Sequence, residues 1–137
     1  SPALLSGEHP VVQPDDLRHH TLLHVDWKSA DASWRMWLLA AGLHDIDPTR
    51  GPRFTMENMA VQAALDGHGV ALIGDILVAD DLAAGRLVRP FDPSLSTPLS
   101  FSFYLLSAKD SAKQPKVSAF RDWLLEEARA SRSGPSQ

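Results

Sequence analysis

The chain contains 137 residues, of which 44% are hydrophobic; it carries a formal net charge of −4 and has no cysteine. This length is enough to bury a sizeable core within one domain. The lack of cysteine excludes disulfides, thiolate zinc sites and a cysteine nucleophile. Residues 1–95 hold 13 Asp/Glu against 7 Lys/Arg, whereas residues 96–137 hold 4 against 6. Because an acidic body repels a phosphate backbone, we do not expect this chain to grip DNA directly.

Hydropathy and the first residues indicate where the protein works. No apolar run approaches the roughly 18 residues of a membrane span. The start, Ser1-Pro2-Ala3-Leu4-Leu5, lacks the basic flank and long apolar stretch of a signal peptide. It also lacks an initiating Met. We therefore expect a fragment of a longer, cytoplasmic protein that makes no membrane contact.

Glycine and proline divide the chain into short units that alternate between strand and helix periodicity. In chain order we expect an initial strand or loop over 1–13 and then a helical turn opening at Pro14. Strands and helices then alternate: strands over 21–25, 51–55, 70–73 and 87–91, with helices between them over 31–41, 56–66 and 75–84. A linker over 92–98 leads to a strand over 99–107, a helix over 115–130 and a disordered tail over 131–137.

Apolar stripes and end signals support the helices. The stripe of the first long helix consists of Trp34, Trp37, Leu38 and Ala41, and Gly42 follows where a left-handed C-cap belongs. The stripe of the second consists of Met59, Ala60, Ala63 and Ala64, with Thr55 as a candidate N-cap and Gly67 as a C-cap. The stripe of the last consists of Val117, Phe120, Trp123, Leu124 and Ala128.

The strands favour an α/β fold with a mainly parallel sheet. Four successive apolar residues over 70–73 suggest a strand buried on both faces, as in parallel sheets. Pro90 has no N–H to donate to a neighbouring strand, so we expect the strand over 87–91 to lie at a sheet edge. The repeated strand-helix order gives the α/β class, and the strand and helix after the linker look like part of a second sheet.

Four stretches in order resemble a known family. They are Pro14-Asp15-Asp16-Leu17 with His20-Thr21-Leu22-Leu23-His24; Trp34 through Trp37-Leu38-Leu39-Ala40-Ala41-Gly42-Leu43; Gly51-Pro52-Arg53-Phe54 with Ala60 to Leu72; and Asp80-Asp81-Leu82-Ala83-Ala84-Gly85-Arg86-Leu87-Val88-Arg89-Pro90-Phe91. Over roughly residues 1 to 130 the chain resembles the effector-binding domain of LysR-type transcriptional regulators, closest to the subgroup of the glycine-cleavage activator and the β-lactamase regulator.

The resemblance implies a two-lobed sensor similar to type 2 periplasmic binding proteins. On that map residues 1–13 are the outgoing crossover strand and hinge, 14–91 the complete second lobe and 92–98 the return hinge. Residues 99–130 are then the last strand and helix of the first lobe. The DNA-binding winged helix-turn-helix and most of the first lobe are absent from this chain. We expect residues 99–130, lacking those packing partners, to dock on a second copy or on another chain.

In a two-lobed sensor the effector lies between the lobes, where strand C-termini and helix N-termini present open N–H groups. Thr55-Met56-Glu57-Asn58 matches such a place, and the resemblance makes Thr55, Met56 and Asn58 candidate ligand residues. Thr55 as a plain helix cap is an equal alternative. Glu57 would disfavour an acidic ligand, so the effector class stays open.

Three further places fit the same rule. Asp26 and Trp27 follow the first strand, although Trp27 is better explained as cover for the core edge. Gly74 follows the third strand, where a plain turn explains it equally well. From the other lobe, Tyr104 or its neighbour Phe103 reaches the cleft, but not both, because alternate strand residues face opposite ways.

Other chemistries have weaker support. His20 and His24 are four residues apart, but on an expected strand and without a third ligand, so we expect no metal and no cofactor. No serine lies in a Gly-x-Ser-x-Gly elbow, and Gly67-His68-Gly69 lacks the spacing of a phosphate loop, so we do not expect an enzyme.

Two other functions stay open. One is a solute-binding protein of the same fold, which an upstream secretory signal would favour and an upstream winged helix-turn-helix would exclude. The other is an interaction module that responds to a partner protein and binds no small ligand.

Overall fold

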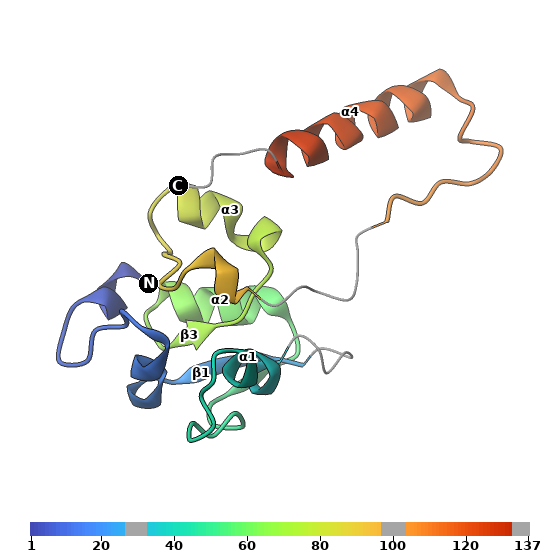
Figure 1. The fold of residues 1–137 in the computed structure, drawn as a ribbon. Helices are drawn as coiled ribbons and strands as arrows, with labels where there is room; N and C mark the ends of the chain where they lie inside the picture. Colours follow the sequence, from blue (N-terminus) through green and yellow to red (C-terminus); the bar gives the residue numbers. More distant parts are fainter. Residues whose placement is uncertain (27–32, 97–103, 133–137) are drawn as a thin grey trace. The chain divides into compact units, whose positions relative to one another are not determined.

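A computed structural model describes residues 1–26, 33–96 and 104–132 of the chain. The chain divides into two compact units, residues 1–100 and residues 101–137. Figure 1 traces the path from the N-terminal turns through the sheet to the final helix.

The first unit is a three-stranded parallel sheet with helices between its strands. Its elements are η1 (Pro2–Leu5), η2 (Pro14–His19), β1 (Leu22–Val25), α1 (Trp34–Ala40), β2 (Arg53–Phe54), α2 (Glu57–Leu65), β3 (Val70–Ala71), α3 (Asp75–Ala83) and η3 (Pro93–Leu95), where η denotes a 3-10 helix. The strand order is β2-β1-β3, with His24 opposite Arg53 and Leu22 opposite Val70. The parallel α/β fold is thus confirmed, with strands of two to four residues that are shorter than the sequence pattern predicts.

The core lies on both faces of the sheet because neighbouring residues of β1 point in opposite directions. Leu22 belongs to one buried cluster together with Trp34, Trp37 and Leu38 of α1. Leu23 belongs to a second cluster together with Ala64 of α2, Val78 of α3 and Leu87. The strands are therefore buried on two sides, as parallel strands usually are.

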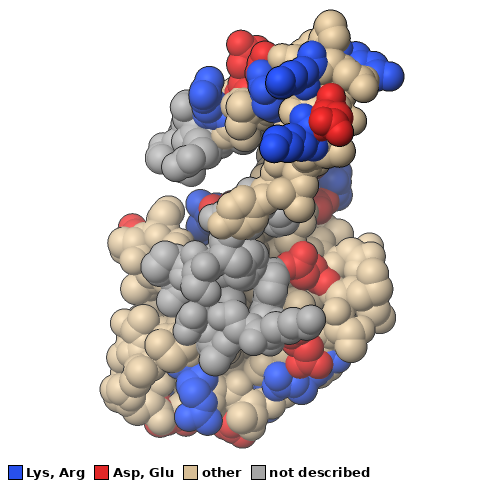
Figure 2. Space-filling model, turned by 90° about the vertical axis from the view of Figure 1, so that its right-hand side faces the viewer, with Lys and Arg blue, Asp and Glu red and all other residues tan. Residues whose placement is uncertain are grey.

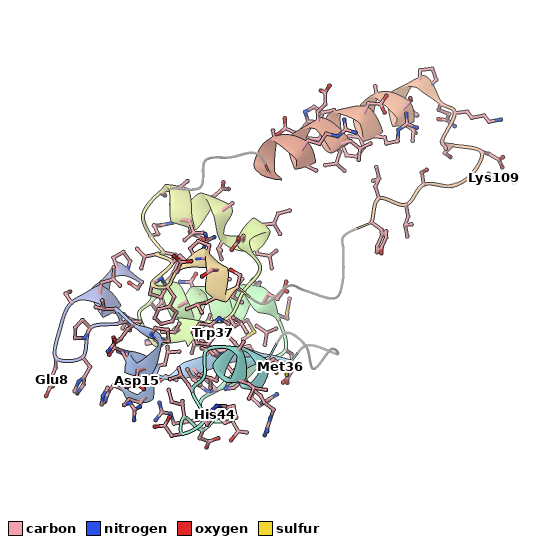
Figure 3. All side chains as sticks on the ribbon, viewed as in Figure 1. Glu8, Asp15, Met36, Trp37, His44 and Lys109 are labelled. Atoms are coloured by element: carbon pink, nitrogen blue, oxygen red, sulfur yellow. The ribbon has the colours of Figure 1, made fainter. Side chains whose placement is uncertain are left out.

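Helix α1 follows its predicted pattern. Ser33 caps it through a side-chain oxygen that accepts from the backbone N–H of Met36, at 3.4 Å. Trp37 faces the sheet whereas Met36 lies on the outer side (Figure 3). Gly42 has a φ of +75°, which fits the expected left-handed end. Residues 31 and 32, the expected start, lie outside the described residues.

Helix α2 differs from the prediction at its start. Its N-cap is Met56, which makes no side-chain cap bond, so Thr55 lies one residue before the cap and does not cap the helix. Ala60 and Ala64 are buried as expected, but Met59 is half exposed. Successive helical residues differ by about 100° in direction, so Met59 falls off the stripe centred on these alanines.

Two predicted strands are wrong within the described residues. Residues 87–91 form no strand: the N–H groups of Arg86 and Leu87 both donate to the carbonyl of Asp81, and Pro90 has no N–H to donate. Leu87 and Phe91 nevertheless pack on the two core clusters. Residues 1–13, expected as a strand or loop, contain the 3-10 turn η1 within a loop.

The second unit contains the other misprediction. Residues 104–107 have no regular structure, and the rest of the expected strand over 99–107 lies outside the described residues. A strand needs a neighbour to satisfy its backbone groups, and none accompanies residues 104–107 among the described residues. Helix α4 (Pro115–Arg132) matches the prediction and ends two residues later than expected. The tail residues 133–137 are not described.

Candidate functional site

The carboxyl ends of the three strands define the candidate site. β1 ends at Val25, β2 at Phe54 and β3 at Ala71. Because the strands are parallel, the segments that follow them emerge at the same edge of the sheet. Three of the predicted places, at Asp26, at residues 55–58 and at Gly74, therefore belong to this edge. Trp27 lies outside the described residues.

Asp26 is engaged by a neighbouring strand. Its Oδ1 accepts a hydrogen bond from Nε of Arg53 at 2.9 Å, and the two side chains form an ion pair. Its backbone N–H donates to the carbonyl of Phe54 at 2.8 Å. A ligand at this point would therefore meet a paired carboxylate. Arg53 was not predicted, since its contact joins residues 27 positions apart in the chain.

The start of α2 is open to solvent. Thr55, Met56 and Asn58 are all exposed, and no side chain caps the helix. The first N–H groups of a helix have no partner within it, so they are available to water or to a ligand. Glu57, half buried in the first turn, adds a negative charge beside them.

A cavity of about 330 Å³ opens beside the end of β3. Gly74, the third predicted place, lines it at the N-cap of α3. Its apolar wall includes Trp34, Trp37 and Phe91. The indole N–H of Trp34 donates to the buried carbonyl of Leu23 at 3.0 Å, which fixes this ring in the wall.

An ion pair borders the same cavity. Nη2 of Arg89 lies 2.9 Å from Oδ1 of Asp75, the first residue of α3, and both side chains line the cavity. Neither residue was predicted as a site residue. Arg89 did carry a signal, because it is the only charged residue in the apolar run Leu87-Val88-Arg89-Pro90-Phe91.

A second cavity, of about 140 Å³, is mainly apolar. It shares Asp75 and Arg89 with the first cavity and is also lined by Leu4, Val78 and Leu87. Its lining overlaps the second core cluster, so it is best explained as incomplete packing of the core.

Tyr104 belongs to the second unit and is 81% exposed. Its role as a ligand contact from the other lobe follows from the family resemblance alone. It stays a prediction.

The histidines serve local structure. His24 is buried, with Nε2 3.0 Å from the carbonyl oxygen of Arg50, and Nε2 of His20 lies 2.7 Å from the carbonyl oxygen of His9. The two rings therefore bind separate segments. Within residues 1–26, 33–96 and 104–132, no three His, Cys, Asp or Glu side chains are grouped as metal ligands. His44 and Glu8 lie exposed at the surface of the first unit (Figure 3).

The parallel sheet, the helices on both of its faces and the polar edge define the class of protein: an α/β ligand-binding fold of the type 2 periplasmic binding protein kind. Residues 1–129 match the LysR substrate binding domain. The chain belongs to this family, and the resemblance found in the sequence is confirmed.

Named relatives support the same assignment. The chain is 39% identical over 130 residues to the glycine cleavage system transcriptional activator of Escherichia coli strain K12. This match covers 95% of the chain and 41% of the relative. It is 34% identical over 137 residues to the transcriptional activator AmpR of Providencia stuartii, covering 91% and 44%. These names describe transcriptional regulators. The chain spans about two fifths of the length of the curated relatives it matches.

Solved structures agree on the fold. The effector domain of the regulator AmpR of Pseudomonas aeruginosa is 36% identical with a TM-score of 0.66, and the match covers 89% of this chain and 57% of that domain. The effector-binding domain of AmpR from Citrobacter freundii has a TM-score of 0.56 at 22% identity, covering 82% and 54%, and it supports the fold alone. No helix in the described part of this chain is long and apolar enough to cross a bilayer.

Proposed function

We propose that this chain is the effector-sensing part of a LysR-type transcriptional regulator and binds a small metabolite. The observation that carries this proposal is the polar sheet edge with its adjoining cavity, within a chain that matches the LysR substrate binding domain from residue 1 to 129. Residues 14–91 would form the second lobe, residues 1–13 and 92–98 the two hinge segments, and residues 99–130 the last strand and helix of the first lobe. The protein would work in the cytoplasm, without catalysis, metal or cofactor.

The mechanism is a hinge closure. A metabolite bound between two lobes stabilises the closed arrangement by its extra contacts there, and this biases an oligomer whose separate winged helix-turn-helix domains hold DNA. DNA contact by residues 1–95 themselves is disfavoured by their charge, with 13 Asp/Glu against 7 Lys/Arg.

The ligand would meet the segments that follow the strands. Thr55, Met56 and Asn58 at the open start of α2, Gly74 at the cavity, and Asp26 and Trp27 after β1 supply this lobe's share of the contacts, and Tyr104 supplies a contact from the other lobe. Exposure of Thr55 and Asn58 supports this assignment, because a hydroxyl and an amide in solvent are free to pair with a ligand.

The test is thermal-shift screening of the longer regulator that contains this chain, against amino acids and muropeptides. A specific ligand must raise the unfolding temperature by mass action. We expect Thr55→Ala and Asn58→Ala to remove about 1 kcal/mol of binding free energy each, the usual worth of one hydrogen bond. Gln62→Ala, on a later and exposed turn of α2, is the matched control.

Two results would contradict the proposal. A secretory signal encoded directly upstream, in place of a winged helix-turn-helix, would indicate a solute-binding protein. A regulator that no small molecule stabilises, but that a partner protein does, would indicate an interaction module.

A further inference from the structure

The ion pair at the end of β3 carries an inference about the chemistry of the ligand. Asp75 and Arg89 line the same cavity, and neither side chain is buried: that of Asp75 is 76% exposed and that of Arg89 41%. An exposed ion pair contributes little to stability, about 0–1 kcal/mol, so a ligand can separate the two groups at small cost.

A third charged side chain lies at the cavity, and it is negative like Asp75. Asp92 lines it, and its carboxylate accepts a 2.7 Å hydrogen bond from the N–H of Ser94. Hydrogen bonds from the hydroxyl and N–H of Ser94 lower the pKa of Asp92, so this group is ionised at neutral pH. Among the described lining residues there are thus two acids, Asp75 and Asp92, and one base, Arg89.

The charges of Arg89 and Asp75 distinguish between classes of ligand that insert between them. A simple carboxylate that pairs with Arg89 displaces Asp75 and leaves that acid without a partner beside Asp92. A simple amine that pairs with Asp75 leaves Arg89 without a partner. A zwitterion pairs its carboxylate with Arg89 and its ammonium with Asp75, so both members of the ion pair keep an opposite charge and Asp92 keeps its hydrogen bond from Ser94.

The rest of the wall defines the remainder of the ligand. Trp34, Trp37 and Phe91 present aromatic surface, and Leu95 adds an aliphatic side chain. A volume of about 330 Å³ lies at the small end of the ~300–1,000 Å³ typical of small-molecule sites. A compact ligand with an apolar part fits this wall better than a sugar or a nucleotide.

We propose that this cavity binds a zwitterionic amino acid with an apolar side chain, which inserts between Arg89 and Asp75. The proposal deepens the sensing function proposed above and rests on it, since Gly74 already belongs to the candidate site. It also gives the ligand a route to the hinge. Arg89 directly precedes the segment that leads to residues 92–98, while Asp75 begins α3, so separating the pair acts on both elements.

The test compares three probes on the 137-residue chain by isothermal titration calorimetry: L-phenylalanine, 3-phenylpropanoate and 2-phenylethylamine. The last two each lack one of the two charges. We expect L-phenylalanine to bind about tenfold more tightly than either, the usual worth of one charge-assisted hydrogen bond. Arg89→Gln should abolish the preference for L-phenylalanine over the amine, and Asp75→Asn its preference over the carboxylate.

Arg86→Gln is the matched control. Arg86 also pairs with an aspartate of α3, Asp81, at 2.6 Å, but it does not line the cavity. It should leave all three affinities unchanged. Thermal unfolding of each variant shows whether it is folded, and Arg89→Lys, which keeps the charge, should retain most of the binding.

Several outcomes would overturn the inference. Equal affinity for L-phenylalanine and 3-phenylpropanoate would indicate a plain anion site, and no heat with any probe would mean that the cavity takes no such ligand. Binding that survives both Arg89→Gln and Asp75→Asn would place the probe elsewhere. If an effector of another class stabilises the regulator through Thr55 and Asn58, the sensing function stands and this inference alone is wrong.

Discussion

Gly51 allows the loop before β2 to approach β1. A Cβ placed on Gly51 would lie 2.0 Å from the carbonyl oxygen of Leu22, and the φ of Gly51 is +112°. Gly51→Ala should therefore lower the free energy of unfolding by more than the about 1–2 kcal/mol that a positive φ costs by itself, because the backbone clash adds to that cost. Urea unfolding followed by circular dichroism measures the loss.

Gly42 provides the control for this prediction. It also has a positive φ, +75°, but a Cβ there would meet nothing within 4 Å. Gly42→Ala should lower the free energy of unfolding only by the about 1–2 kcal/mol that a positive φ costs a residue with a side chain. Equal losses for Gly51→Ala and Gly42→Ala would show that the close approach to Leu22 does not matter for stability.

Single residues also show where prediction from the sequence ends. The buried stripe of Trp34, Trp37 and Leu38 was predictable, because it depends on spacing within one helix. The guanidinium of Arg50 was not: it donates to the carbonyls of Leu17, Arg18 and His20, more than 29 positions away in the chain. The same holds for the pair of Arg89 with Asp75, which only folding brings together.

Among the elements, the 3-10 helix η2 contains a titratable cap. The Asp16 carboxylate accepts 2.9 Å hydrogen bonds from the N–H groups of Val12 and Gln13. These bonds hold the pKa of Asp16 below its ordinary value near 3.8, that of Gln13 contributing most. A lowered pKa in the folded state gives stability that is complete above the ordinary value and is lost as pH falls through the lowered one.

We therefore expect Asp16→Asn to flatten the acid limb of the stability curve. An asparagine oxygen can still accept both hydrogen bonds but does not titrate, so the variant should lose less stability than the natural chain between about pH 5 and pH 2. Urea unfolding at several pH values measures the slope. Glu8→Gln, an exposed carboxylate in the same N-terminal segment, is the control. An unchanged slope in Asp16→Asn would exclude this cap as a source of acid sensitivity.

Elements were predictable where the pattern is local and not where they need a distant partner. Helices α1, α3 and α4 appear close to their predicted bounds, because apolar periodicity lies within each segment and a glycine with positive φ follows α1 and α3. The strands expected over 87–91 and within 104–107 do not form in the described residues. The apolar run over 87–91 does mark a buried residue, Leu87, whereas Tyr104, Leu105 and Leu106 are exposed. A strand also requires a neighbour for its backbone groups, and no local pattern provides one.

At the scale of the whole molecule, α4 lacks a covering surface within the described part of its own unit. Phe120 and Trp123 are 54% and 52% exposed on it, and Leu106, earlier in the same unit, is 88% exposed. A helix of 18 residues with so much exposed aromatic surface is unusual for a chain that stays monomeric. Charge favours association with the first unit of another copy: residues 96–137 carry 6 Lys/Arg against 4 Asp/Glu, opposite in sign to residues 1–95. Lys and Arg side chains stand out on the α4 unit in Figure 2.

We therefore expect the 137-residue chain to self-associate, with residues 99–130 of one copy docked on a second copy. Light scattering coupled to size-exclusion chromatography should give a mass above that of one chain, 15.0 kDa. Trp123→Asp places a charge in the apolar contact and should shift the population towards monomer, since a large buried aromatic contributes about 2 kcal/mol or more to an interface. Ala119→Ser, at an exposed and uncharged position of the same helix, should leave the mass unchanged. A monodisperse monomer of the unaltered chain would show that the apolar face of α4 does not mediate contact between copies.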